Sequence, residues 1–158
     1  MRKTFIETLT EFAEKDPKII LILGDVGFSF LEPFKERFPK QFLNVGIAEQ
    51  NMMTFAAGLA YKGFKPWIYT MSNFILLRPL EQVRNDICFP NHNVKLISVK
   101  GSAAYQFLGV SHNLFPGEEE AILSTLPNIT KHFPQTDEEC QKIIRDEYER
   151  KGPSYIRL

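Results

Sequence analysis

The acidic side chain of Glu49 stands in the segment NVGIAEQNMM, residues 44–53, at the head of a predicted helix. It follows a short apolar stretch and a glycine, and it precedes the small-residue run AAGLA, residues 56–60, which allows the helix to approach another backbone closely. A carboxylate in this place either interacts with the positive end of its helix or, when packing removes its water, shares a proton with a ligand nitrogen. The residue types alone leave both interpretations open.

Two other side chains have types suited to the same chemistry. Phe74 follows a predicted strand, which places its ring at the carboxyl edge of a sheet, and His112 lies in a predicted loop over 102–117. A phenylalanine also serves as a core residue, and a lone loop histidine is often only solvated. His92 and His132 have no supporting motif, and we interpret both as structural or surface residues.

The hydrophobic pattern alternates between helical and strand-like periods, which predicts the elements that position these side chains. Helices are predicted over 5–16, 32–39, 50–63, 78–89, 118–127 and 136–152, and strands over 18–27, 65–72, 93–101, 128–134 and 154–158. The strand over 18–27 is a continuous apolar run, which predicts burial on both faces, and the strand over 93–101 is expected to be buried as well. The pattern predicts an α/β fold with three layers, a parallel β-sheet with helices on both faces, in a single domain over 1–158. In such folds ligands bind outside the carboxyl ends of the strands.

The composition excludes several classes of protein. The 158 residues carry 19 basic and 19 acidic side chains, so no basic face for nucleic acid is expected. No apolar run is long enough for a membrane span, and the first residues do not resemble a signal peptide. Cys88 and Cys140 stand apart, without a CxxC motif or a His/Cys cluster, so neither a disulfide framework nor a metal site is expected. A reducing, cytoplasmic location fits this cysteine usage.

The segment FLNVGIAEQNMMTFAAGLAYKGFKPWIYTMSNFILLRPLEQVRNDI, residues 42–87, closely resembles the pyrimidine-binding domain of transketolases and of 1-deoxyxylulose-5-phosphate synthases. These are thiamine-diphosphate enzymes. The likeness extends along the chain through LGDVG, VSHN, LPNI, FPQTDEE and GPSYIRL. Each piece alone is a weak signal, whereas the combination is specific. The resemblance implies the thiamine-diphosphate-binding fold of the pyrimidine-module type.

The resemblance also implies a role for the acid. The glutamate that matches Glu49 hydrogen-bonds N1′ of the cofactor's aminopyrimidine ring and favours the imino form of its 4′-amino group, which then removes the thiazolium C2 proton. The aromatic residue that matches Phe74 stacks on the pyrimidine, and Met71 takes the place of a further aromatic three residues earlier. The histidine that matches His112 lies near the reacting substrate.

Four more residues have two interpretations each. Asp25 and Gln50 are expected either to line the subunit junction near the cofactor or to act as turn or capping residues. Arg78 and Arg84 either meet an anionic substrate or are solvated helix residues.

The chain departs from the family pattern where the substrate would be recognised. Leu108 stands where larger transketolases have an aspartate that contacts a donor hydroxyl, and Ser124 stands where an arginine is usual. The segment NLFPGEEE is also about two residues longer than the usual link. The residues that match the family's cofactor-binding positions are present, whereas the sequence does not identify the donor and acceptor sugars.

The sequence contains no Gly-Asp-Gly motif, which holds the diphosphate and its Mg2+ or Ca2+ ion in this family. We therefore expect a diphosphate-binding transketolase subunit as partner, with thiamine diphosphate bridging the two chains in a heterotetramer that contains a homodimer of this chain. The predicted function is transfer of a two-carbon ketol unit between sugars or sugar phosphates. The alternatives are a deoxyxylulose-phosphate-synthase-like reaction, a 2-oxo acid decarboxylation, a non-catalytic assembly module, or a plain flavodoxin-like binding domain.

Overall fold

A six-stranded, wholly parallel sheet forms the centre of the computed structural model, which describes residues 1–27, 30–99 and 103–158. Its spatial order is β2-β1-β3-β4-β6-β5. The strands are β1 (Ile19–Leu23), β2 (Phe42–Asn44), β3 (Lys65–Met71), β4 (Lys95–Val99), β5 (Thr130–His132) and β6 (Ser154–Arg157). The helices are α1 (Arg2–Ala13), α2 (Glu32–Arg37), α3 (Glu49–Tyr61), α4 (Ser72–Leu76), α5 (Leu80–Gln82), the π-helical η1 (Val83–Cys88), the 3-10 segment η2 (Ala103–Ser111), α6 (Glu118–Ser124) and α7 (Asp137–Glu149).

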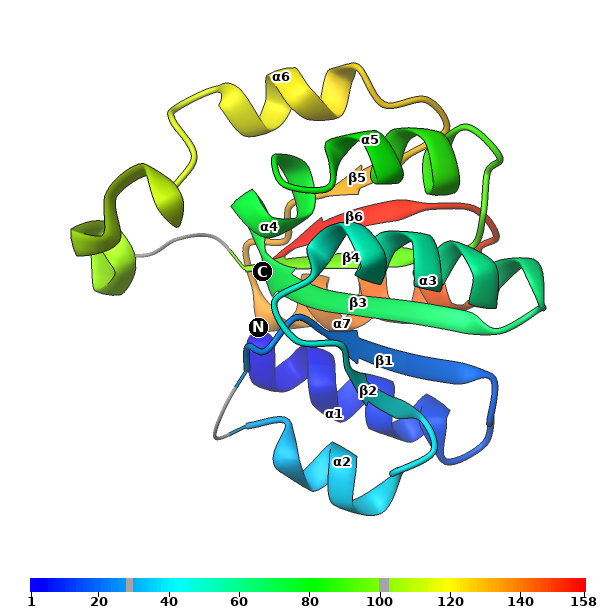
Figure 1. Ribbon diagram of the computed structural model, residues 1–158. Helices are drawn as coiled ribbons and strands as arrows, with labels where there is room; N and C mark the ends of the chain where they lie inside the picture. The colour runs from blue at the N-terminus through cyan, green and yellow to red at the C-terminus, as the bar shows by residue number, and fades with distance from the viewer. Residues whose placement is uncertain (28–29, 100–102) are drawn as a thin grey trace.

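The helices cover both faces of the sheet, so the predicted three-layer α/β fold is confirmed. In Figure 1, α3, α4, α5 and α6 lie on one face, and α1, α2 and α7 lie on the other. Each face has its own apolar cluster, one including Met52 and Leu123 and the other including Phe5 and Ile144. All five residues of β1 are buried, because a strand between two helical layers has no solvated face.

The two cysteines lie in different clusters, Cys88 on the α3 face and Cys140 on the α7 face. Both are free thiols, and burial raises the pKa of Cys88 to about 12 and that of Cys140 to about 11. Their placement agrees with the expectation that the chain has no disulfide framework.

Three local predictions were wrong. β2 was not predicted, because a three-residue edge strand with half-buried side chains gives almost no periodic signal. The predicted loop over 102–117 contains η2, whose turns are interrupted at Gly109 with φ of 59°. No helix was predicted over 73–77, whereas α4 begins directly after β3, which ends at Met71. Phe74 therefore lies on a short helix at the carboxyl edge of the sheet.

The strand order determines where the ends of β1, β2 and β3 meet. β1 pairs with β2 on one side and with β3 on the other, and β3 is followed by β4 on its far side. The connections that follow β1 and β3 therefore lead in opposite directions. Ligands of open parallel sheets bind at such a switch point, outside the carboxyl ends of the strands. Asp25, Glu49 and Phe74 follow the ends of these three strands. The fold thus brings three of the predicted site residues to one edge.

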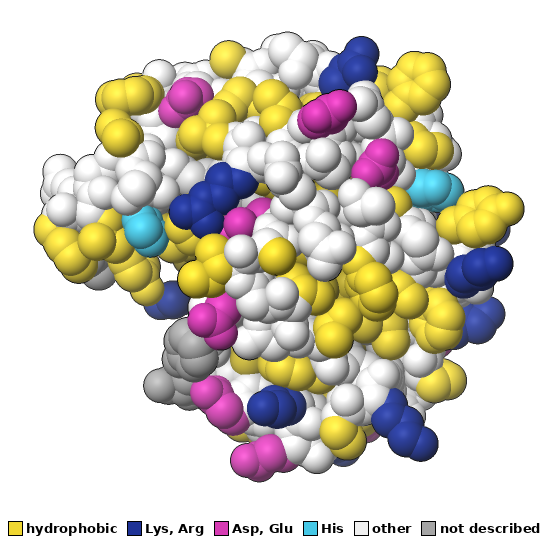
Figure 2. Space-filling model, in the orientation of Figure 1, with side chains coloured by type: hydrophobic (Ala, Val, Ile, Leu, Met, Phe, Trp, Pro, Cys, Tyr) yellow, Lys and Arg dark blue, Asp and Glu magenta, His cyan; other side chains and the backbone are white. Residues whose placement is uncertain are grey.

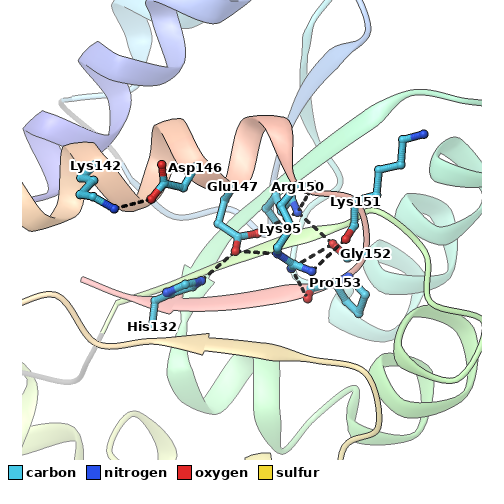
Figure 3. Close-up of polar contacts among 9 residues, drawn as sticks. All are labelled: Lys95, His132, Lys142, Asp146, Glu147, Arg150, Lys151, Gly152 and Pro153. Atoms are coloured by element: carbon cyan, nitrogen blue, oxygen red, sulfur yellow. Dashed lines mark hydrogen bonds and ion pairs between the residues drawn. The ribbon is translucent and has the colours of Figure 1, made fainter.

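A buried polar cluster lies at the other end of the sheet, where β4 begins (Figure 3). Lys95 donates to Oε2 of Glu147 at 2.9 Å and to the carbonyl oxygens of Arg150 and Gly152 at 3.0 and 2.9 Å. Oε1 of Glu147 contacts Nε2 of His132 at 2.8 Å and accepts from Nε of Arg150 at 2.8 Å. The cluster fastens α7 to β4 and β5, so His132 has the structural role that we expected.

Candidate functional site

Glu49 is the first residue of α3, and its side chain is 6% exposed. The N-cap residue, Ala48, offers no side-chain cap to the helix. One carboxylate oxygen, Oε1, accepts a hydrogen bond from Nη1 of Arg78 at 2.6 Å. Arg78 is far more accessible, with 42% of its side chain exposed. Arg78 therefore reaches the buried acid from the solvent side.

The same guanidinium also lies over the ring of Phe74, with Cζ 3.8 Å from the ring centroid. Such cation–π contacts stabilise a pair by about 0.5–2 kcal/mol, according to how far the charge is desolvated. Phe74 is on α4 and Arg78 follows it, whereas Glu49 begins α3. Arg78 therefore bridges the acid and the aromatic ring that were predicted to hold a pyrimidine.

The small residues AAGLA of α3, residues 56–60, include both buried and exposed positions. Ala56 and Ala57 are buried in the cluster on this face of the sheet, so the helix approaches the sheet through alanines. Gly58 is exposed, and a Cβ added there would meet no atom within 4 Å. The alanine side of this run therefore packs in the core of this chain, whereas the glycine position is open.

Two hollows adjoin these residues. The first has a volume of about 460 Å³ and is lined by Ile47, Ala48, Glu49, Gln50, Asn51 and Arg78. The second has a volume of about 280 Å³ and is lined by Arg2, Asp25, Val26, Gly27, Phe30, Tyr69, Thr70, Met71, Phe74, Val99, Tyr105 and His112. The predicted cofactor and catalytic residues thus divide between two hollows, and the contact of Arg78 with Phe74 lies between them.

His112 and Phe74 are in contact. Their ring centroids are 5.1 Å apart at an interplanar angle of 72°, and Nδ1 of His112 lies 2.8 Å from Oγ of Ser111. The segment that carries the histidine is attached to α4, because the side-chain amide of Asn73 donates to the carbonyl of Val110 at 3.1 Å. The long-range packing therefore brings His112 to the predicted site.

Asp25 has a left-handed backbone with φ of 57° and is held by the side chain of Asn44. The backbone N–H of Asp25 donates to Oδ1 of Asn44 at 3.1 Å, and Nδ2 of Asn44 donates to Oδ1 of Asp25 at 3.1 Å. Oδ1 of Asn44 also accepts from the N–H of Gly46 at 3.0 Å. Asn44 thus joins the turns after β1 and β2, and Asp25 lines the second hollow as well.

The sequence reasoning missed several residues of the second hollow. Arg2 reaches it from the start of α1 and interacts with Tyr69, whose pKa burial raises to about 12. Thr70 also lines this hollow, and its buried Oγ1 has no hydrogen-bond partner among the described residues. No local motif marks Arg2, because its relation to the site comes only from the packing of α1 against the sheet.

A third hollow, of about 250 Å³, adjoins a buried polar network at the ends of β4 and β6. The Tyr155 hydroxyl donates to Oε1 of Glu119 and lies 2.7 Å from Oγ of Ser98, and Arg157 donates to Oε2 of Glu119 at 2.7 Å. Burial, reinforced by the Glu119 carboxylate, raises the pKa of Tyr155 well above its ordinary value. Glu119 belongs to a run of three glutamates, so its sequence did not distinguish it from a solvated residue.

The other residues that the sequence singled out lie outside the linings described above. Leu108 is half-buried in η2, and Ser124 is exposed at the end of α6. Arg84 is exposed and donates to the side chain of Asn85. His92 packs against Tyr61, with ring centroids 6.3 Å apart. Only Arg78, of the two arginines considered, is in contact with the site.

Among the described residues, no group of three or more His, Cys, Asp or Glu side chains is arranged to hold a metal ion. Every helix in the described ranges is too short or too polar to cross a lipid bilayer. The face shown in Figure 2 mixes acidic and basic side chains, and apolar side chains gather on η2, at the left, and along α3. The most exposed apolar residues of these two elements are Phe107 at 82%, Tyr61 at 73%, Val110 at 65% and Phe55 at 44%.

Comparison with known proteins gives consistent matches. The family model described as "Transketolase, pyrimidine binding domain" matches residues 1–158. The chain is 34% identical over 158 residues to an apulose-4-phosphate transketolase subunit of Phocaeicola vulgatus, covering 99% of this chain and 50% of the relative. It is 34% identical over 159 residues to a putative transketolase C-terminal section of Methanocaldococcus jannaschii, covering 100% of this chain and 50% of the relative.

A solved structure titled "Split gene transketolase, inactive beta4 tetramer" superposes with a TM-score of 0.86 at 35% identity, covering 99% of this chain and 50% of that one. The chain thus spans about half the length of the relatives that it matches. The fold, the sequence identity and the match to the family model agree along the chain. This chain therefore belongs to the family of transketolase pyrimidine-binding domains.

Proposed function

We propose that the chain, as a single domain over 1–158, is the pyrimidine-binding component of a split transketolase-type enzyme that transfers a two-carbon ketol unit between sugars. One observation carries the proposal: a buried carboxylate, Glu49, and an aromatic ring, Phe74, lie close enough for one flat guanidinium to contact both. An aminopyrimidine is also flat and rich in nitrogen. The pair therefore fits the ring that the family binds.

The residues of the chain have separate tasks in this proposal. Glu49 holds a proton at the ring nitrogen of the pyrimidine, since it is a buried acid beside an open hollow. Phe74 orients the ring by stacking, and Met71 and Gln50 complete its surroundings. When bound, thiamine diphosphate supplies the electron sink for cleavage of a carbon–carbon bond.

The second hollow suits a polar substrate. His112 lies beside Phe74 and is placed to exchange a proton with a substrate hydroxyl, while Asp25 offers a carboxylate at the same hollow. Arg2 supplies a positive charge there, which favours a phosphorylated or otherwise anionic sugar. Leu108 offers no hydroxyl-binding group, so the donor is recognised differently from that of larger transketolases.

A partner subunit is part of the proposal. The chain has no Gly-Asp-Gly motif, so the diphosphate and its Mg2+ or Ca2+ ion would be held by a diphosphate-binding transketolase subunit. Exposed apolar residues on α3 and η2, such as Phe55 and Phe107, offer contact area beside the hollows. We propose a cytoplasmic heterotetramer with a homodimer of this chain, in line with the relative that is named as a transketolase subunit.

A deoxyxylulose-phosphate-synthase-like condensation is the second candidate. The chain is 33% identical over 156 residues to the 1-deoxy-D-xylulose-5-phosphate synthase of Desulfitobacterium hafniense, of which it covers 24%. The two candidates share the cofactor half of the site and differ in the donor. Pyruvate as donor would identify the condensation, and a ketose donor would identify ketol transfer.

The test is reconstitution with a Gly-Asp-Gly subunit from the same genome, thiamine diphosphate and magnesium. Two-carbon transfer from a panel of ketoses, with pyruvate in parallel, is measured by product analysis. Glu49→Gln is expected to lower turnover by about 10²–10⁴-fold, the usual contribution of a positioned proton-transfer group. Arg84→Gln is the matched control, since Arg84 is exposed and bonds only to Asn85 among the contacts described.

Full activity of Glu49→Gln in the assembled complex would overturn the catalytic proposal. The chain would then be an assembly module that keeps the fold without activating the cofactor.

A further inference from the structure

We propose that Arg78 is an internal occupant of the pyrimidine site. Its guanidinium takes the place between Glu49 and Phe74 in the cofactor-free chain, and it moves out when an aminopyrimidine binds. This inference rests on the proposed function. It adds an autoinhibitory contact, formed by the chain itself, that competes with the cofactor for the same two side chains.

The competition follows from geometry. Arg78 donates to Oε1 of Glu49 at 2.6 Å and places Cζ 3.8 Å from the centroid of the Phe74 ring. These are the two contacts that a flat, nitrogen-rich ring requires: a carboxylate acceptor and an aromatic face. His112 approaches the same phenylalanine edge-on at 5.1 Å. A pyrimidine stacked on the face that Arg78 covers therefore displaces the arginine.

The two partners differ in their freedom to move. Glu49 is 6% exposed and fixed at the start of α3, whereas 42% of the Arg78 side chain is exposed. A hollow of about 460 Å³ adjoins the guanidinium, and Leu77 beside it is also exposed. The long arginine side chain can thus turn into water and keep its charge solvated. Arg78, and not Glu49, is the group that leaves.

The hydrogen bond between Arg78 and Glu49 stabilises the chain before the cofactor binds. A buried carboxylate without a partner is costly, because it has lost its water without gaining a donor. Arg78 supplies a donor until the cofactor arrives. The apparent affinity for the pyrimidine is then reduced by the fraction of molecules in which Arg78 occupies the site. Removal of the arginine should therefore tighten binding.

The first experiment examines the contact without any ligand. In an NMR spectrum of the full chain, the side-chain N–H signals of Arg78 should be displaced by the ring current of Phe74, and Phe74→Leu should return them to ordinary values. Ordinary values in the unchanged chain would overturn the inference, whatever the function of the protein.

The second experiment uses thiamine as the probe, titrated into the full chain and followed by the same spectra. Arg78→Met removes the flat cation but keeps a side chain of similar length, and Arg84→Met is the matched control. We expect Arg78→Met to bind thiamine about tenfold more tightly, Arg84→Met to bind as the unchanged chain does, and Arg78→Lys to lie between them. Urea midpoints of all variants show that they are folded.

The outcomes separate the two proposals. If thiamine binds the unchanged chain through Glu49 and Phe74 but Arg78→Met binds it equally or more weakly, the internal-occupant inference is overturned and the proposed function stands. If thiamine binds none of the variants, either alone or assembled with the Gly-Asp-Gly subunit, the pyrimidine site itself is refuted, and the inference fails with it.

Discussion

Glu49 and Glu147 are both buried acids, yet they differ in the side chains that donate hydrogen bonds to them. Glu147, 1% exposed, contacts the side chains of Lys95, His132 and Arg150 (Figure 3). Glu49, 6% exposed, has one oxygen paired to Arg78. Burial alone would raise the pKa of Glu147, but its three donors together hold that pKa well below the ordinary value.

The difference lies in the burial of the donors. Lys95 is itself 2% exposed and also bonds to two backbone carbonyls, so neither member of that pair can leave without breaking several contacts. The donor to Glu49, Arg78, has 42% of its side chain exposed. Glu147 therefore fastens α7 to the sheet, whereas Glu49, on the proposed function, exchanges its exposed donor for a ligand.

The largest expected effect compares removal of the two cations. Lys95→Met leaves a buried carboxylate and two buried carbonyls without their donor, so it should lower the free energy of unfolding by about 3–5 kcal/mol. Arg78→Met also leaves a buried acid without its donor, but it should lower the free energy of unfolding by only about 1–2 kcal/mol, because water in the adjoining hollow can replace the guanidinium. Urea denaturation of both variants measures the difference. Equal losses would remove the distinction between the two acids.

The pH dependence of stability tests the role assigned to Glu147. The pKa of Glu147 is lower in the folded chain than its ordinary value of 4.5, so the unfolded chain binds the proton more tightly. The stabilisation from this group is therefore present above about pH 4.5 and is lost as the pH falls below it. The stability advantage of the unchanged chain over Glu147→Gln should shrink across this range, as measured by urea denaturation at several pH values. A constant difference between the two proteins would contradict the prediction.

His132→Ala should have an intermediate effect. It removes one of two contacts to Oε1 of Glu147, and Arg150 still donates to the same oxygen. The expected loss is about 1–2 kcal/mol in the free energy of unfolding. Thermal or urea denaturation measures it, with His92→Ala as a control of the same residue type. A loss as large as that of Lys95→Met would show that the histidine stabilises the cluster as much as the lysine does.

The smallest effect is expected at an ion pair on the solvent-exposed side of α7. Lys142 and Asp146 form an exposed pair four residues apart, with N to O at 2.7 Å. Because both side chains are solvated, and lysine precedes the acid, Lys142→Ala should change the free energy of unfolding by less than about 0.5 kcal/mol. A loss above about 1 kcal/mol in the same urea assay would mean that α7 is stabilised as much at its surface as at Glu147.

Short-range patterns predicted the layers well and the irregular segments poorly. The continuous apolar run of β1 predicted a strand with two covered faces. The helix predicted over 136–152 is α7, whose N-cap is Thr136, with its hydroxyl accepting from the N–H of Glu139. β2 and η2 have no comparable pattern, since a three-residue edge strand and turns interrupted at Gly109 depend on contacts with other elements.

The candidate site shows the same limit. The segment around Glu49, with Phe74 and His112, indicated the family and the kind of ligand. The bond from Arg78 to Glu49 spans 29 positions and that from Lys95 to Glu147 spans 52, and neither was predicted. Both depend on the strand order, which is set by how the crossovers pack and not by neighbouring residues.

The sequence by itself determined that this chain forms a parallel α/β sheet, that its charges balance, and that an acid stands at the head of a closely packed helix. Only the tertiary structure decided which acid has several buried donors and which is paired to an exposed arginine. Hydrophobic period and helix signals act between residues close in the chain, so they appear in the sequence. The donors of a buried carboxylate come from distant strands and helices, and only their packing brings Lys95 to Glu147 and Arg78 to Glu49.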